Sequence, residues 1–235
     1  MATQLSRTFS SQGNQKKFTI SVWVKRSKLG ATQSIMGSGG GGAYATHMYW
    51  DNNDQLEVWN WFNSAYQGRY KTNRYFRDTS AWYHLVVAVD TTQSTSSDRI
   101  KMYVNSTQIS DFASSTYPSQ DHTAYINDDR AHHIGRRGYS DYYSFDGYMT
   151  EIILVDGQQL TPTSFGATNP VTNIWEPIAY AGTYGTNGFK LNFSDSSALG
   201  DDTSGNTNDF TVNNLTSIDQ TTDTCTNNFA TLNPL

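Results

Sequence analysis

The sequence is poor in the residues that cross-link, anchor or strongly charge a protein. Cys225 is the single cysteine among 235 residues, so no intrachain disulfide can form, which suits folding in a reducing cytoplasm. Only 16% of the residues are charged and the formal net charge is −5, whereas proteins that bind duplex nucleic acid usually carry a basic excess. No apolar run approaches the roughly 20 residues of a membrane span, and the first residues lack the apolar core of a signal peptide. We therefore expect neither nucleic acid nor a membrane as the main partner.

Long amphipathic helices are missing too, and a period of two takes their place. In residues 18–24 the apolar side chains of Phe18, Ile20, Val22 and Val24 share one face of an extended segment. Similar alternation recurs in residues 55–62, 99–105 and 188–193, and residues 82–90 are apolar on both faces, as a central strand requires. Turn-forming clusters separate these runs at residues 37–43, 51–54, 91–98 and 194–209. Many short strands with almost no helix predict an all-β sandwich of two antiparallel sheets.

The composition changes near residue 169. The chain beyond it is poor in charge and rich in Thr and Asn, with scattered aromatic residues. We predict a sandwich over residues 1–169 and a C-terminal extension over residues 170–235. The extension is expected to pack on the sandwich or extend from it, and to carry a few strands of its own.

Five segments occur in a recognisable order: FTISVWVKRS, WYHLVVAVDTTQ, RIKMYVN, HIGRRG and FDGYMTEIILVDGQQLTPTSFG. This order, over residues 5–166, resembles the concanavalin A-like lectin/glucanase superfamily and, within it, the laminin-G-like domains. The resemblance implies a jelly-roll of two packed sheets. One departure is the turn at Asn105 and Ser106, where relatives have Asn-Gly, so this turn cannot rely on glycine for a positive φ. Relatives also tend to have an additional early strand, and we expect residues 188–193 to fill that sheet edge.

The Thr- and Asn-rich tail is similar to the tails of laminin-G-like proteins in marine bacteriophage genomes, where such domains occur in tail fibres, adhesins and capsid decoration. This resemblance implies a non-enzymatic protein of the virion surface, made in the host bacterial cytoplasm. A capsid decoration or cement protein, or a tail-associated structural protein, would contact other capsid or tail subunits. A homo-oligomer is expected, because virion parts repeat by symmetry. The alternative is a receptor-binding, lectin-like adhesin that recognises host cell-surface glycans.

A third, less favoured function is glycan hydrolysis, which needs two carboxyl groups about 5–9 Å apart in one groove. The glucanases of the superfamily carry two Glu and an Asp at alternate positions of one strand. This chain has three Glu (Glu57, Glu151 and Glu176), and no two are neighbours along one strand. We expect Glu151 to form a salt bridge or hydrogen bond across a sheet, and His84 to be a buried, hydrogen-bonded core residue. The sequence is therefore not expected to encode an enzyme.

Two acid-rich turns are candidate calcium sites, because a hard cation needs several converging oxygens. The candidate ligands are Asp51, Asp54, Asp201 and Asp202. Asp and Asn are also ordinary turn formers, and this second interpretation is favoured.

Two runs rich in aromatic residues, at residues 49–62 and 138–145, lie beside polar loops. Lectins stack such rings on pyranose faces, and protein interfaces are enriched in Tyr and Trp. The candidate glycan-contacting or partner-contacting residues are Trp50, Trp59, Trp61, Tyr139, Tyr142 and Tyr143.

Overall fold

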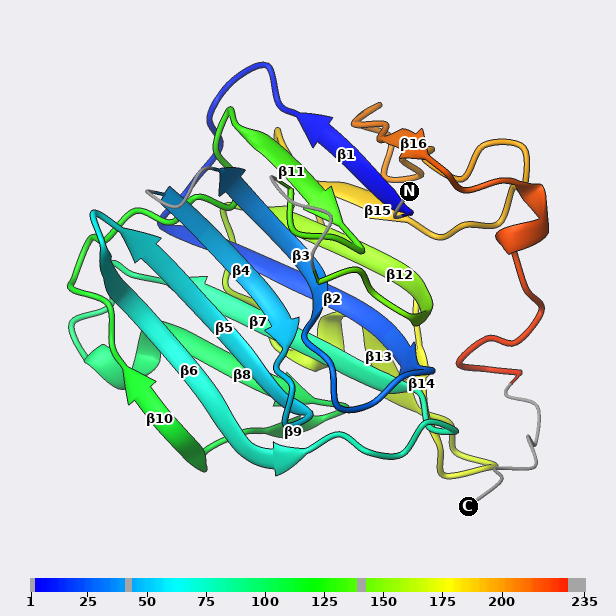
Figure 1. The fold of residues 1–235 in the computed structure, drawn as a ribbon, viewed down its shortest axis with the longest axis horizontal. Helices are drawn as coiled ribbons and strands as arrows, with labels where there is room; N and C mark the ends of the chain where they lie inside the picture. The colour runs from blue at the N-terminus through cyan, green and yellow to red at the C-terminus, as the bar shows by residue number, and fades with distance from the viewer. Residues whose placement is uncertain (1–2, 41–43, 139–142, 228–235) are drawn as a thin grey trace.

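Two antiparallel sheets face each other in the computed structural model, which describes residues 3–40, 44–138 and 143–227 (Figure 1). The eight-stranded sheet has the order β10 (Phe112–Thr116), β6 (Ala65–Tyr75), β5 (Gln55–Phe62), β4 (Tyr44–Trp50), β3 (Gln33–Gly40), β11 (Ala131–Ile134), β1 (Gln4–Thr8) and β16 (Thr211–Asn213). The six-stranded sheet has the order β15 (Phe189–Leu191), β12 (Gly147–Asp156), β2 (Lys17–Arg26), β7 (Tyr83–Asp90), β8 (Ile100–Val104) and β9 (Thr107–Gln108). The predicted all-β sandwich is confirmed.

The remaining elements are short. A two-stranded sheet joins β13 (Gly166–Thr168) to β14 (Trp175–Pro177), and the helical turns are η1 (Ser96–Asp98), η2 (Pro162–Ser164) and η3 (Ser217–Asp219). Among the described residues, none of these turns approaches the length and apolar character that crossing a membrane requires.

The main core lies between the two large sheets, as the period of two predicts. Phe18, Ile20, Val22 and Val24 of β2 all belong to this core. A second apolar cluster covers the outer face of the six-stranded sheet, where Val86 of β7 and Val155 of β12 pack against residues that follow β12. Both faces of β7 are therefore buried, which confirms the prediction of a central strand.

His84 of β7 links this outer layer to the sheet. Its Nδ1 accepts a hydrogen bond from Trp175 Nε1 at 3.0 Å, and its Nε2 lies 2.8 Å from Ser21 Oγ. Because Nδ1 accepts, the proton of the neutral ring is on Nε2, which donates to Ser21 and cannot act as a base toward it. Burial lowers the pKa of His84 to about 3, which keeps the ring neutral. The predicted buried, hydrogen-bonded histidine is confirmed.

Residues beyond 169 take part in the sheets and the core. β14 pairs with β13 across this position, and β15 pairs with β12 at the edge of the six-stranded sheet, which confirms that residues 188–193 supply an edge strand. Phe189 packs edge-on against Phe210 at 4.7 Å, and both rings belong to the main core. One apolar core therefore receives side chains from both predicted parts of the chain.

The turns at residue 105 and at residues 37–43 differ in how well the sequence predicted them. Asn105 has φ = +56°, and its side-chain oxygen accepts the backbone N–H of His84 at 3.0 Å, so asparagine supplies the conformation without glycine. The prediction of a turn over residues 37–43 is wrong for its first half, since Gly37 to Gly40 extend strand β3. Residues 41–43 lie outside the described residues.

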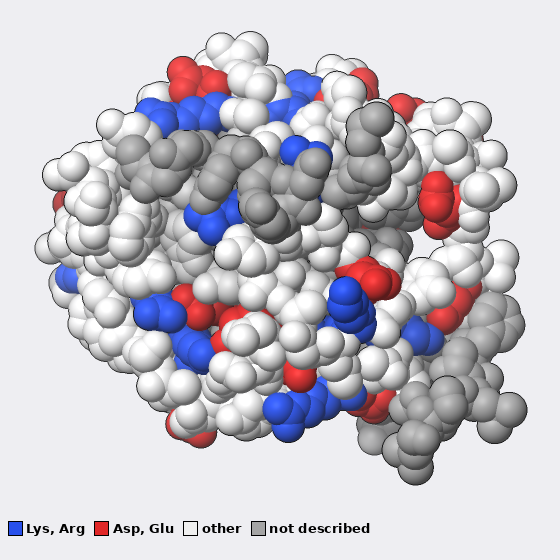
Figure 2. Space-filling view, viewed as in Figure 1, with Lys and Arg blue, Asp and Glu red and all other residues white. Residues whose placement is uncertain are grey.

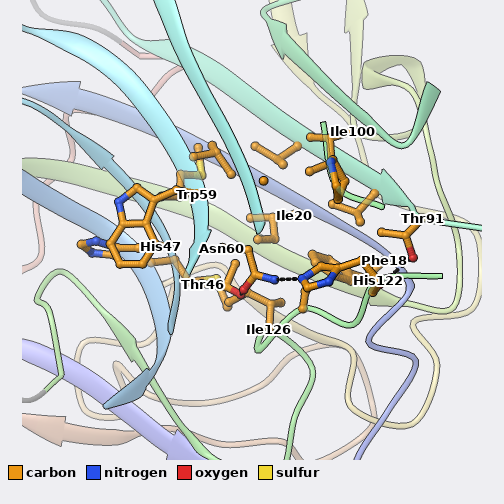
Figure 3. Close-up of a pocket in the computed structure, with 18 residues that line it drawn as sticks. Phe18, Ile20, Thr46, His47, Trp59, Asn60, Thr91, Ile100, His122 and Ile126 are labelled. Atoms are coloured by element: carbon orange, nitrogen blue, oxygen red, sulfur yellow. Dashed lines mark hydrogen bonds between the residues drawn. The ribbon is translucent and has the colours of Figure 1, made fainter. Parts of the chain in front are cut away.

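A cavity of about 30 Å³ remains between the two sheets (Figure 3). Phe18 and Ile20 of β2 line it from one side, while Asn60 of β5 and His122 point toward each other and form a hydrogen bond at its margin (Figure 3). A space of this size holds about one water molecule. It is a gap in the packing rather than a site for a larger ligand.

Candidate functional site

A groove lies on the outer face of the eight-stranded sheet, across β4, β5 and β6. The core-facing residues of β5 include Leu56 and Val58, so the alternate residues of this strand point outward. Outward-facing side chains of the three strands lie opposite one another in two rows: His47, Trp59 and Arg69 in one, and Tyr49, Glu57 and Lys71 in the next. The groove has a volume of about 520 Å³. Acidic and basic side chains lie next to one another over β5 and β6 (Figure 2).

Aromatic rings form one wall of the groove. The rings of Trp61 and Tyr66 meet edge to face at 4.7 Å, and Trp59 lies 6.0 Å from Tyr66. Trp59 is nearly buried, whereas Tyr66 is 38% exposed. The exposed parts of these rings offer an apolar surface to a ligand in the groove.

The charges of the groove are paired across strands. Arg69 Nε donates to Glu57 Oε1 at 2.7 Å and Arg69 Nη2 donates to Oε2 at 3.3 Å, while Lys71 Nζ lies 2.5 Å from Asp51 Oδ2. The hydrogen bonds from Arg69 to Glu57 raise the pKa of the guanidinium, which lies 4.6 Å above the Tyr66 ring. Glu57 itself is 1% exposed. Both of its oxygens are thus occupied by Arg69 at the base of the groove.

His47 forms part of the buried base of the groove. Its Nε2 lies 2.6 Å from Ser34 Oγ, and its ring stacks on Tyr49 at 4.9 Å. Burial, with a contribution from Arg137, lowers the pKa of His47 to about 3, so the ring is neutral. The ring reaches over β3 because Gly37 lies there: a Cβ at this position would be 2.8 Å from His47 Cδ2.

The structure separates the aromatic candidates of the sequence. Trp59, Trp61 and Tyr143 line the groove, whereas Tyr139 and Tyr142 lie outside the described residues. The prediction for Trp50 is wrong. This side chain is fully buried in the main core, with the guanidinium of Arg26 stacked on it at 4.9 Å, and it has no surface to offer a ligand.

Other groove residues were not among the candidate contact residues predicted from the sequence: His47, Tyr49, Glu57, Tyr66, Arg69 and Lys71. The alternation of β5 places Glu57 on the same face as Trp59 and was readable in advance. The residues of β4 and β6 depend on the register of the sheet, which the sequence pattern does not give.

The first acid-rich turn is held together by its own carboxylates. Asp51 accepts two backbone N–H groups of the turn at 2.9 Å and also pairs with Lys71. Asp54 lies between Arg26 at 3.0 Å and Arg77 at 3.2 Å. Asp54 also accepts the backbone N–H of Gly30 at 2.8 Å, so both carboxylates are engaged by backbone groups and by cations.

The second acid-rich turn lies between β15 and β16. Asp202 accepts the backbone N–H groups of Lys190 and Asn208, each at 2.8 Å, while Asp201 is exposed beside it. The two acid-rich turns therefore belong to different parts of the fold. Within residues 3–40, 44–138 and 143–227, no group of three or more His, Cys, Asp or Glu side chains is placed to hold a metal ion.

Glu151 lies in the six-stranded sheet, near the middle of β12. It forms the predicted salt bridge, with Lys190 of the neighbouring strand β15 at 2.8 Å. Its φ of +49° marks a bulge in the pairing of β12 with β2, between Thr150 and Ile153. It therefore belongs to a different surface from Glu57.

Comparison with solved structures finds the same architecture elsewhere. A heptameric SAP-like pentraxin from Limulus polyphemus is 13% identical with a TM-score of 0.51, over 75% of this chain and 86% of that one. The CBM40 domain of the Ruminococcus gnavus IT-sialidase, bound to α2,3-sialyllactose, is 15% identical with a TM-score of 0.45, over 68% and 94%. Domains LG4–5 of the mouse laminin α1 chain are 10% identical with a TM-score of 0.47, over 77% and 44%. At 13% identity, the likeness to the pentraxin shows the fold alone.

No curated protein sequence matches this chain. A family of laminin G type, described as the concanavalin A-like lectin/glucanases superfamily, matches residues 3–164. This match covers both large sheets except β15 and β16, as well as the whole groove. With two packed antiparallel sheets and a family match over more than half of its length, the chain belongs to the concanavalin A-like lectin/glucanases superfamily.

Proposed function

We propose that the protein is a glycan-binding, lectin-like module whose site is the groove across β4, β5 and β6. The observation that carries this proposal is the combination of partly exposed Trp61 and Tyr66 rings with fixed polar groups in one groove of about 520 Å³. Aromatic faces suit the apolar faces of sugar rings, and polar side chains at the margin suit their hydroxyls. Membership of a superfamily that contains lectins supports the same function.

The polar margin of the groove is suited to hydroxyl groups. Asn52 and Asn53 are exposed at the turn between β4 and β5, and both line the groove. An amide side chain both donates and accepts hydrogen bonds, as a sugar hydroxyl does. The sheet fixes the turn, so these groups are positioned before a ligand arrives, which reduces the entropic cost of binding.

The same groove favours binding over cleavage. Hydrolysis would need one carboxyl group to donate a proton to the leaving oxygen and a second to act on the sugar ring. Glu57 is buried with both oxygens on Arg69, and Asp51 is paired with Lys71. We therefore propose that the protein is not an enzyme, and incubation of labelled oligosaccharides with the protein tests this by chromatography of the products.

Replacing Tyr66 by alanine is expected to weaken glycan binding about tenfold or more, equivalent to about 1.4 kcal/mol, because the ligand loses a stacking surface. A glycan array first identifies a ligand, and isothermal titration then compares the variant with the wild type. The array is run with calcium and with EDTA, which also tests whether the two acid-rich turns, the candidate calcium sites, affect binding. Silence across the array in both conditions would contradict the proposed function.

Tyr75→Ala is the matched control for that experiment. Tyr75 lies at the other end of β6, is 52% exposed, and carries Arg77 over its ring at 4.5 Å, much as Tyr66 carries Arg69. Because Tyr75 does not line the groove, its replacement should leave affinity within about twofold. Equal losses in the two variants would show that the groove is not the binding site.

A second candidate function is attachment to other subunits of a phage particle as a decoration, cement or tail-associated protein. Val171 is 90% exposed, Ile174 55% and Ile178 40%, all at the hairpin of β13 and β14. Val171 and Ile174 lie in the loop of this hairpin and Ile178 follows β14, and exposed apolar side chains of this kind favour a protein contact. The resemblance of the C-terminal tail to marine phage proteins supports the same proposal, with the protein at the virion surface and repeated by symmetry.

Replacing Val171 and Ile174 together by serine tests this second function. Both side chains are exposed, so the fold should be retained while attachment to particles falls about tenfold or more. The measurement is quantitative mass spectrometry of particles purified from cells that carry the wild-type or the variant gene. Unchanged incorporation, or absence of the wild-type protein from the particles, would contradict the proposal.

A further inference from the structure

Strand β12 is paired along its whole length on one side only. On that side β12 pairs with β2 from Gly147 to Asp156, with the bulge between Thr150 and Ile153. On the other side, β15 pairs only with residues Ile152 to Leu154. In the part of the chain that the structure describes, no strand lies against Gly147 to Thr150 on that side. In an antiparallel strand every second residue points its N–H and C=O groups away from the partner, so this half of β12 is an open edge.

This open edge faces a pocket of about 680 Å³ on the flank where the two sheets part. Six consecutive residues of β12, from Gly147 to Ile152, line the pocket. Leu5 of β1 and Ile134 of β11 line it from the eight-stranded sheet. A hollow is visible on this flank, at the right of the view, between the C-terminal segment and the rest of the molecule (Figure 2).

The C-terminal segment, residues 219–227, forms the outer wall of the pocket. Within the described part of the chain, its side chains form hydrogen bonds with β2 and with the residues after β15, not with β12. Asp223 accepts a hydrogen bond from Lys25 Nζ at 2.8 Å, and Lys25 is nearly buried. Gln220 Nε2 donates to the backbone carbonyl of Phe193 at 2.6 Å. The segment runs alongside the sandwich beyond β12 and β15 (Figure 1). These two attachments leave a slot between the wall and the strand edge.

The slot combines apolar side chains beside β12 with a polar C-terminal wall, and its charges are balanced. Phe145, Met149 and Phe193 line it and pack against the main core. Of its acidic side chains, Glu151 pairs with Lys190, Asp223 pairs with Lys25, and Asp219 accepts hydrogen bonds within its own turn. An occupant with a net charge would therefore lose hydration without gaining a counter-ion.

We propose that this slot binds an extended, uncharged peptide strand of a partner protein, which pairs with the open edge of β12 at Gly147 to Thr150. Strand addition to an exposed edge gives affinity through backbone hydrogen bonds and selectivity through alternate side chains. Four residues in extended form span about 13 Å at the strand repeat. We expect the bound peptide to place apolar side chains against the pocket floor and small polar side chains at the positions between them. This site is separate from the glycan groove and requires no glycan.

The test uses the full chain and a fluorescent hexapeptide of sequence Thr-Val-Thr-Ile-Ser-Val with blocked ends. Fluorescence polarisation measures its binding, and two further peptides carry N-methyl groups on the odd or on the even residues. Because one edge of the peptide pairs with β12, methylation of that set should weaken binding about tenfold or more, and the other set should change it by less than about threefold. Lysine in place of the three apolar residues should abolish binding. Equal effects of the two methylated sets, or no binding of the parent peptide, would overturn the proposal.

Hydrogen exchange of the complex locates the peptide. Within Gly147 to Thr150, the amides that point away from β2 should exchange about tenfold more slowly in the complex, because the new strand covers them. The edge strand β10, at Phe112–Thr116, is the internal control, since it is also open on one side. Protection of β10 instead, or of both edges alike, would contradict selective binding in the slot. Tyr66→Ala should leave peptide binding unchanged, so failure of the glycan proposal and failure of this one are distinguishable.

Discussion

Replacing Asp54 by alanine is expected to lower the free energy of unfolding by about 3–5 kcal/mol, because it leaves the buried guanidinium of Arg26 without its counter-ion. Arg26 is fully buried and donates to Asp54 at 3.0 Å and to the carbonyl of Phe76 at 2.8 Å. Burial lowers the pKa of Arg26 in spite of this carboxylate, so the arginine already bears a desolvation cost. Urea unfolding followed by tryptophan fluorescence measures the loss.

The carboxylate of Asp54 is the centre of this arrangement. Burial alone would raise its pKa, but hydrogen bonds from the backbone of Gly30 and from Arg26 and Arg77 outweigh burial and lower it. The pairing therefore stabilises the ionised form of Asp54, but it does not fully offset the desolvation of the Arg26 guanidinium. Removal of Asp54 would leave that desolvation with no carboxylate to offset it, which is why a large loss of stability is expected.

Arg77→Ala is the control, since Arg77 binds the same carboxylate at 3.2 Å but its side chain is 59% exposed. An exposed ion pair contributes about 1 kcal/mol or less, so this variant should remain close to the wild type. If Asp54→Ala and Arg77→Ala lower the free energy of unfolding by similar amounts, the buried Arg26–Asp54 pair does not make the large contribution predicted for it.

The fold was predictable where a strand alternates cleanly. In β2, residues Phe18 to Val24 alternate between the core and the opposite face, and the phase is clear from the sequence alone. The same holds for β5, where Val58 faces the core and Glu57 and Trp59 face the groove. Local alternation suffices in these strands because polar residues, such as Ser21 in β2 and Glu57 in β5, mark the face opposite Val22 and Val58.

The phase of β4 was not predictable in this way. The strand reads Tyr-Ala-Thr-His-Met-Tyr-Trp and has apolar or aromatic side chains on both faces. Trp50 follows Met48 on the core side, while Tyr49 and His47 face the groove. Trp50 was predicted to contact a ligand because it precedes a polar turn. It faces the core instead, on the same side of β4 as Met48.

The charged partners in the groove and the open edge of β12 depend on pairing between strands. Arg69 lies opposite Trp59 and reaches Glu57 diagonally, in a register that follows a shift in the pairing of β5 with β6 between Asn60 and Trp61. The slot beside β12 exists because β15 is three residues long and β12 is ten. The sequence indicates both strands but does not specify how far they overlap, and that overlap creates the site.

The protein is expected to lose about 6 kcal/mol of stability between pH 7 and pH 5, because three histidines are buried in neutral form. Burial lowers the pKa of His47 and His84 to about 3 and that of His132 to about 4. In the unfolded chain each regains a pKa of about 6.5. Below that value the unfolded chain binds more protons than the fold, so the stability is fully present above pH 6.5 and is lost as the pH falls toward 4.

The slope of the free energy of unfolding against pH distinguishes the buried histidines from the aspartates, which protonate at lower pH. These three histidines together give a slope of about 4 kcal/mol per pH unit between roughly pH 4.5 and 6, and burial also lowers the pKa of His122 and His133, which add to it in the same direction. His84→Gln should reduce the slope by about 1.4 kcal/mol per pH unit. The reduction is expected whatever the variant's stability at pH 7, since the slope counts protons rather than contacts. Aspartates with lowered pKa values, such as Asp78 and Asp90, bind their protons at lower pH and act below this window. A flat profile in the wild type, or an unchanged slope in His84→Gln, would show that these rings are not neutral in the fold. Imidazole NMR signals of the native protein at pH 5 provide the independent check.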